Sequence, residues 1–147
     1  MGATQTVNNK NILILRKVID WMEVAFVLGG IAFEYDEEKN QRNIKKHGIS
    51  FKNAARVFFD YDRVELYDEE NSSAEDRYNV IGDLSAGSLQ LKNSGEPAIR
   101  SIDGLLFVVY TERVKKIKDG QETEVIRIIS ARFATSFERG LYYGKYE

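Results

Sequence analysis

The sequence predicts a single α+β domain, in which one antiparallel sheet of about four strands is covered by helices. Three features predict this class. Apolar residues recur at helical spacing before Asp60, and they alternate with polar residues after it, as strands with one buried face require. The third feature is the segment TSFE at 135–138, which has the composition of a capping box and indicates a last helix.

The first expected element is an amphipathic helix within residues 10–31. Apolar residues there recur at spacings of three and four: Ile12, Leu15, Ile19, Met22 and Phe26. Charged side chains interrupt this segment, whereas a membrane span needs about 20 nearly uncharged residues. We therefore predict a helical N-terminal extension over residues 1–31 and a main domain over residues 32–147.

Two helices are expected after a short strand at residues 33–35. Asp36 suits the N-cap of a helix that runs through about Lys46, and Gly48 stands where a left-handed residue ends such a helix. Ser50 can cap the second helix. Its apolar stripe consists of Phe51, Ala54, Ala55 and Phe58.

The predicted sheet follows Asp60. Four segments alternate and are rich in β-branched and aromatic residues: 64–67, 77–81, 105–113 and 124–132. Residues 82–104 contain the single proline and much Gly and Ser, so we interpret them as a long hairpin loop. Residues 114–123 form a second expected loop, with Asp119-Gly120 at its turn.

Composition excludes several classes of site. The chain of 147 residues has one histidine and no cysteine. The lack of cysteine excludes a disulfide framework, a thiolate zinc site and a cysteine nucleophile. We predict no metal and no cofactor, and a cytoplasmic location, because the lack of cysteine suits a reducing compartment. The net charge of −2 gives no general basic surface, so nucleic-acid binding would need a local patch.

His47 has two interpretations. It lies at the end of the first expected helix, where a cation complements the helix dipole and needs no further explanation. Histidine also titrates near neutral pH and can transfer protons in catalysis. The spacing alone does not decide between a helix end and a catalyst.

Four segments carry a resemblance to a known family: FEYDEEKNQRNIKKHGISFKNAARVF at 33–58, DRYNVIG at 76–82, VVYTER at 108–113 and RIISARFATSFER at 127–139. In order and spacing they resemble the BrnT family of type II toxins. The resemblance implies a RelE-like fold and ribonuclease activity that inhibits translation and growth. It also implies a BrnA-like antitoxin partner, contact with DNA only through that antitoxin, no membrane, and leaves a homodimer within the complex open.

The resemblance suggests roles for particular side chains. Metal-independent RNA cleavage uses the neighbouring 2′-hydroxyl as nucleophile, so a protein must move protons and stabilise charge on the phosphoryl oxygens. We expect catalysis by His47, Arg113 and Arg132. The expected RNA-binding residues are Lys39, Lys46 and Arg77, and the expected supporting residues are Glu34, as a base, and Glu112, which by alternation faces away from Arg113.

Arg113 and Arg132 present a geometric difficulty. In a simple hairpin they lie near opposite ends, about 20 Å apart by strand rise, so one phosphate cannot contact both. We expect Arg132 to serve the reaction, because it precedes a capped helix, and Arg113 to bind a flanking phosphate. The alternative function is a catalytically weak or inactive antitoxin-binding module that acts in a DNA-binding autoregulatory complex.

Overall fold

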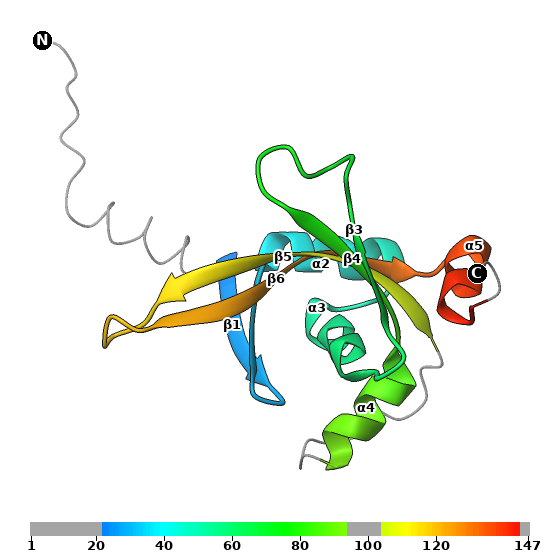
Figure 1. Ribbon diagram of the computed structural model, residues 1–147, viewed down its shortest axis with the longest axis horizontal. Helices are drawn as coiled ribbons and strands as arrows, with labels where there is room; N and C mark the ends of the chain where they lie inside the picture. Colours follow the sequence, from blue (N-terminus) through cyan, green and yellow to red (C-terminus); the bar gives the residue numbers. More distant parts are fainter. Residues whose placement is uncertain (1–21, 94–103, 145–147) are drawn as a thin grey trace, which may run out of the picture.

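The structure is a computed structural model that describes residues 22–93 and 104–144. It confirms the α+β class, with helices packed against one mixed sheet (Figure 1). The strand order is β1-β2-β6-β5-β4-β3. The strands are β1 (Glu23–Leu28), β2 (Ile31–Asp36), β3 (Val64–Tyr67), β4 (Arg77–Asp83), β5 (Leu105–Lys116) and β6 (Glu122–Phe133). The described part of the chain thus has six strands, where about four were expected.

The two strands beyond the expected sheet of four are β1, which was not predicted, and β2, which contains the short strand expected at residues 33–35, and they lie at one side of the sheet. β2 pairs in parallel with β6, whereas the other strand pairs are antiparallel. β1 pairs with β2 through a turn at Gly29-Gly30, where both residues have positive φ. The expected helix over residues 10–31 is therefore wrong for Glu23–Leu28, and residues 1–21 lie outside the described residues. The helical spacing of Met22 and Phe26 favoured a helix, although Val24, Phe26 and Leu28 alternate with exposed residues and contact the core.

β5 and β6 form a long hairpin that extends past the neighbouring strands (Figure 1). The strands reach Lys116 and begin again at Glu122, so the loop is shorter than the 114–123 that we predicted. Gly120 has φ of 76° in the expected turn. The register shifts between Val109 and Tyr110, which indicates a β-bulge.

Residues 82–104 are not only a loop, because α4 (Leu84–Asn93) occupies much of this segment. Its small residues misled the prediction, since Ser and Gly have low helix propensity. Tertiary packing explains them. A Cβ atom at Gly87 would lie 1.9 Å from the carbonyl oxygen of Arg56, so the helix approaches the preceding segment at a distance that requires glycine.

The capping predictions are confirmed. Asp36 accepts hydrogen bonds from the first turn of α2 (Glu37–His47), and Gly48 ends it in the left-handed region with φ of 73°. Ser50 caps α3 (Phe51–Ala54), which continues as the 3₁₀ helix η1 (Ala55–Phe59). Thr135 and Glu138 form the expected capping box of α5 (Ser136–Tyr142).

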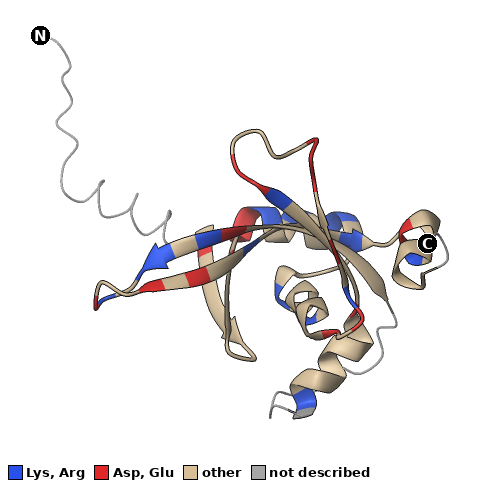
Figure 2. Ribbon diagram, viewed as in Figure 1, with Lys and Arg blue, Asp and Glu red and all other residues tan. Residues whose placement is uncertain are grey.

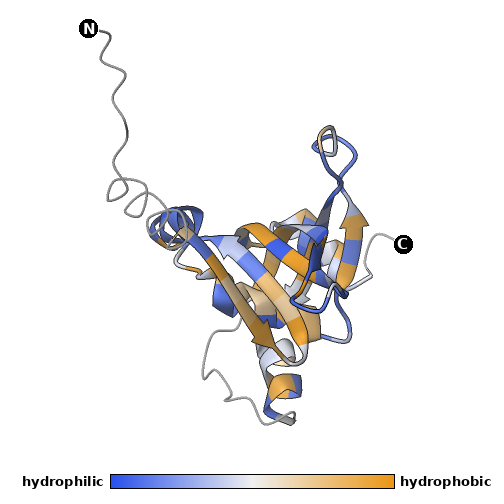
Figure 3. Ribbon diagram, turned by 90° about the vertical axis from the view of Figure 1, so that its left-hand side faces the viewer, coloured by the Kyte–Doolittle hydropathy of each residue, from blue (hydrophilic) through white to orange (hydrophobic). Residues whose placement is uncertain are grey.

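The core lies between the helices α3, η1 and α4 and one face of the sheet. We call this face of the sheet the core face. Phe58 packs against Phe33 and Tyr110, with ring centroids 5.5 and 4.9 Å away. Tyr35 meets Phe51 edge to face. The predicted stripe of the second helix is buried here. Hydropathic colouring shows apolar residues on the strands of this sheet (Figure 3).

α2 lies against β6, beyond the part of β6 that pairs with β2. The Asn43 side chain donates a hydrogen bond to the carbonyl of Ala131 and accepts one from its amide. β2 pairs with β6 only at residues 125–127, so Asn43 satisfies backbone groups that no strand reaches. Among the described residues, no helix is both long and apolar enough to cross a membrane.

Candidate functional site

Charged side chains from three strands meet on the face of the sheet opposite the core face, which we call the outer face. Glu34 of β2 lies beside Arg127 of β6, and Arg127 lies opposite Thr111 of β5. Paired residues share a face, and Arg113 and Lys115 follow Thr111 at every second position. Alternation therefore places all these side chains on the outer face, because Phe33 and Tyr35 beside Glu34, Tyr110 beside Thr111 and Ile128 beside Arg127 lie in the core.

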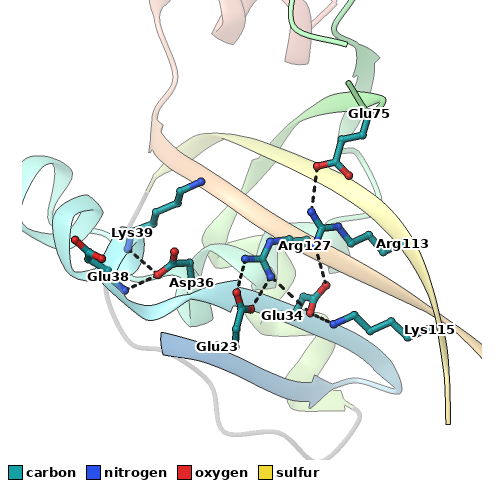
Figure 4. Close-up of polar contacts among 9 residues, drawn as sticks. All are labelled: Glu23, Glu34, Asp36, Glu38, Lys39, Glu75, Arg113, Lys115 and Arg127. Carbon is teal, nitrogen blue, oxygen red and sulfur yellow. Dashed lines mark hydrogen bonds and ion pairs between the residues drawn. The ribbon is translucent and has the colours of Figure 1, made fainter. Parts of the chain in front are cut away.

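Glu34 is the centre of this group. Its side chain is 4% exposed, and Lys115 pairs with its Oε2 atom. Nη1 of Arg127 lies 3.6 Å from Oε2, and Nη1 of Arg113 lies 3.9 Å from Oε1. Within residues 22–93 and 104–144, the Oε1 atom has no hydrogen-bond partner. Figure 4 shows the three cationic side chains converging on this carboxylate from β5 and β6, which compensates its burial.

Two further carboxylates accept hydrogen bonds from Arg127 and Arg113. Arg127 donates two hydrogen bonds to Glu23 of β1, of 2.7 and 2.9 Å. Arg113 donates one of 3.1 Å to Glu75. The hydrogen bond from Arg127 lowers the pKa of Glu23, against the opposing effect of partial burial. We call the set Glu23, Glu34, Glu75, Arg113, Lys115 and Arg127 the Glu34 cluster.

A pocket opens at the Glu34 cluster. Its volume is about 320 Å³, and its lining consists of Glu23, Val24, Ala25, Glu34, Arg113, Lys115 and Arg127. The cationic groups are donors suited to phosphate, and the arginine forks can bind two oxygens at once. Beside the pocket, Thr111 lies between Arg77 and Arg127 in the register, and its buried hydroxyl has no hydrogen-bond partner in the described part of the chain. This arrangement can hold an anionic ligand next to a buried carboxylate.

Comparison with known proteins finds a matching family model. A family model described as "Ribonuclease toxin, BrnT, of type II toxin-antitoxin system" matches residues 35–91. The resemblance seen in the sequence is confirmed. No curated protein matches the chain. The description of that family names a ribonuclease toxin of a type II toxin-antitoxin system, and the match covers the segment from residue 35 to residue 91.

The BrnT-like segment, residues 35–91, contains only some of the predicted site residues. His47, Lys39, Lys46 and Arg77 fall inside it. Glu34 lies one residue before it, whereas Arg113 and Arg132 come well after it. The Glu34 cluster is thus built from strands on both sides of the BrnT-like segment, with Glu75 as its contribution from within.

His47 and Lys46 lie in the last turn of α2, and neither lines the pocket at the Glu34 cluster. His47 is half-buried and Lys46 is exposed. Because Asn43 binds the backbone of Ala131, the end of α2 lies against the end of β6, near Arg132. Among the described residues, no hydrogen bond or ion pair joins His47 to Arg132. The structure brings these elements together without linking the two side chains.

Arg132 is engaged in local contacts. It donates two hydrogen bonds to Glu138, of 2.7 and 2.9 Å, and its guanidinium lies over the Phe107 ring, 4.2 Å from the centroid. The hydrogen bond with Glu138 raises the pKa of Arg132. Arg132 pairs with Phe107 in the register, whereas Arg113 pairs with Val125. The expected separation along the hairpin is therefore confirmed.

The remaining predicted residues lie apart from the pocket. Lys39 is exposed in the first turn of α2, and its side chain points away from Glu34 in Figure 4. Arg77 lies on the outer face of β4, and β6 and β5 stand between it and the strand of Glu34. Glu112 pairs with Ile126 and faces away from Arg113, as alternation predicted.

Sequence reasoning missed Arg127, Lys115 and Glu23. Arg127 stands two residues before Ile129 in an expected strand, and its alternation with Ile126 and Ile128 marks it as facing away from the core. That signal was available. Lys115 fell in an expected loop, and Glu23 in an expected helix, so their positions on the outer face were hidden by errors in secondary structure.

Proposed function

We propose that this protein is the toxin of a type II toxin-antitoxin pair and cleaves RNA without a metal ion, at the Glu34 cluster. The observation that carries this proposal is a buried carboxylate surrounded by Arg113, Lys115 and Arg127 beside an open pocket. The family match supports the substrate class. The cluster combines a base with several cationic side chains that can donate hydrogen bonds to phosphate. Cleavage by the 2′-hydroxyl requires both kinds of group.

The proposed reaction assigns one step to each side chain. Arg113 turns from Glu75 and Oε1 of Glu34 to the phosphoryl oxygens, which uncovers Oε1. Glu34 accepts the proton of the 2′-hydroxyl, whose oxygen attacks phosphorus. The bond to the 5′-oxygen breaks, and the Lys115 ammonium donates a proton to that oxygen. The products are a 2′,3′-cyclic phosphate and a 5′-hydroxyl end.

Three cationic side chains supply the positive charge in this scheme. Charge develops on the phosphoryl oxygens as the 2′-oxygen attacks, and preorganised donors in a partly dry site stabilise it. Arg113 and Arg127 stay protonated at any working pH. They therefore take the role that a divalent ion fills in metal-dependent nucleases.

Arg132 takes a structural role in this proposal, the reverse of the expectation from sequence. Its guanidinium is bound to Glu138, which belongs to the capping box of α5. His47 and Lys46 contribute to RNA binding at the end of α2, and Lys39 and Arg77 contribute positive charge. A BrnA-like antitoxin is the proposed protein partner, and contact with operator DNA is proposed only through it. A homodimer of the toxin within that complex is part of the same proposal.

The test is cleavage of single-stranded RNA by the purified protein in the presence of EDTA. We expect cleavage to persist, and we expect a substrate with one 2′-deoxynucleotide at the cleaved position to resist cleavage at that bond alone. Product ends should carry a cyclic phosphate. Activity that disappears with EDTA and returns with magnesium would contradict the metal-independent mechanism. Cleavage at the 2′-deoxy position would contradict the role of the 2′-hydroxyl.

A further inference from the structure

The pair between Glu23 and Arg127 differs from an ordinary surface ion pair. Arg127 is largely buried, with 15% of its side chain exposed, whereas Glu23 is 49% exposed. Arg127 already has the buried Glu34 carboxylate 3.6 Å away. Its charge is therefore partly balanced without Glu23, and the outer carboxylate is the one that solvent can reach and replace.

Glu23 also has the geometry of a bound phosphodiester. Its two carboxylate oxygens accept the two hydrogen bonds of the Arg127 fork, which is how arginine binds two oxygens of a phosphate. Glu23 lines the pocket together with Arg127 and Lys115. If Glu23 turns toward solvent, its place can be taken by an anionic group that enters this pocket.

We infer that Arg127 binds a phosphate of the RNA strand and that Glu23 occupies this phosphate position in the RNA-free protein. The inference rests on the proposed function and adds a residue and a subsite to it. Binding then includes an exchange, in which one phosphate replaces one carboxylate on Arg127. Glu23 lies outside the BrnT-like segment, on a strand at the edge of the sheet.

The exchange has a consequence for affinity. The Glu34 cluster contains three cationic and three anionic side chains, so it has no excess charge while Glu23 and Glu75 remain in place. An incoming phosphate must compete with Glu23 for Arg127. Neutralising Glu23 removes this competitor and should tighten RNA binding.

The first experiment measures binding of a 2′-fluoro RNA, which lacks the nucleophile and cannot be cleaved, by fluorescence anisotropy. We expect Glu23→Gln to lower the Kd by about three- to tenfold, because a charge at the rim of the site is removed. Glu65→Gln is the matched control. It removes the same charge and breaks the 3.0 Å pair between Glu65 and Arg63. Glu65 lies on β3 opposite the core residue Val80, so it belongs to the other face of the sheet from the Glu34 cluster. We expect the control to change the Kd by less than about twofold.

The second experiment makes the same change without Arg127. In an Arg127→Gln background, Glu23→Gln should leave the Kd unchanged, since the coupling between the two residues has been removed. Arg127→Gln should also reduce the salt dependence of log Kd by about 0.7, the value for one phosphate contact on a single strand. Arg127→Lys keeps the charge without the fork and should lose only part of the affinity. Thermal unfolding identifies variants that have not folded.

The outcomes separate this inference from the proposed function. Equal tightening by Glu23→Gln in both backgrounds would show a general charge effect and overturn the inference. No tightening would also overturn it, even if the protein cleaves RNA. Conversely, tightening that depends on Arg127 supports the phosphate subsite even if cleavage fails in EDTA, in which case only the proposed reaction is wrong.

Discussion

The two ends of the β5–β6 hairpin carry arginines in contrasting environments. Arg113 lies beside the buried Glu34 carboxylate, at the edge of a pocket, and donates a hydrogen bond to one exposed glutamate. Arg132 is fixed by a two-point contact with Glu138 and by stacking on Phe107. Figure 2 shows that basic and acidic residues alternate along this hairpin. The sequence context of an arginine does not reveal its role, because the role depends on what already occupies its hydrogen-bond donors.

The largest expected effect separates these two arginines by chemistry. Arg113→Ala should reduce the cleavage rate at saturating enzyme by about 10²–10³, as the loss of one preorganised donor does in other enzymes. Single-turnover cleavage measures this rate, since saturation removes the contribution of weaker binding. Arg63→Ala, at an exposed pair on the edge of the sheet, is the control. A larger rate loss for Arg132→Ala than for Arg113→Ala would reverse the comparison.

Arg132→Ala should act on stability instead. Its pair with Glu138 is partly exposed, with 36% of the arginine side chain accessible, so solvent screening limits its contribution to about 1 kcal/mol. For a chain of this size, that corresponds to a fall in Tm of about 2–4 °C. Thermal unfolding by circular dichroism measures it. An unchanged Tm together with a lost saturated cleavage rate would mean that Arg132 serves the reaction.

The same pair predicts a pH dependence. Burial raises the pKa of Glu138, but the hydrogen bonds from Arg132 and Thr135 outweigh this and lower the pKa below its ordinary value of 4.5. A lowered pKa in the folded state gives stability that is present above pH 4.5 and is lost as the pH falls through the lowered pKa. The Tm difference between the wild type and Glu138→Gln should therefore be full at pH 7 and shrink below 4.5. A Tm difference that does not change with pH would mean that the Arg132–Glu138 pair is not the source of this stability.

The smallest expected effect concerns His47. At the end of α2, a cation complements the helix dipole and contributes roughly 0.3–1 kcal/mol, so His47→Ala should lower stability slightly. Under the proposed mechanism the saturated cleavage rate should stay within about threefold of the wild type, and growth inhibition should persist. A folded His47→Ala protein without toxicity would instead move the catalytic centre to the end of α2.

The sequence predicted the features that depend on local interactions. Asp36, Ser50 and Thr135 were identified as helix caps because each cap needs only hydrogen bonds to amides two or three residues away. α4 was missed because its small residues reflect close packing on η1, which propensity does not contain. The helical structure of residues 84–93 therefore depends on tertiary packing rather than on local propensity.

The candidate site was only partly predictable for a related reason. Glu34 and Arg113 were both singled out, yet their proximity depends on the parallel pairing of β2 with β6. No local pattern specifies which strands become neighbours across such a distance in sequence. Arg127 could have been found from alternation, but its contact with Glu23 required β1 to be a strand rather than the expected helix.

The parallel pairing of β2 with β6 also has a consequence for folding order. Lys115 is 81 residues from Glu34 along the chain, and Arg127 is 104 residues from Glu23. Contacts between such distant residues close large loops and form late, after local hairpins and helices. During synthesis, β6 must leave the ribosome before these cationic groups can reach their carboxylates. A nascent chain therefore carries the BrnT-like segment before it has an assembled Glu34 cluster, so the RNA cleavage that we propose for this site must wait until β6 has been synthesised.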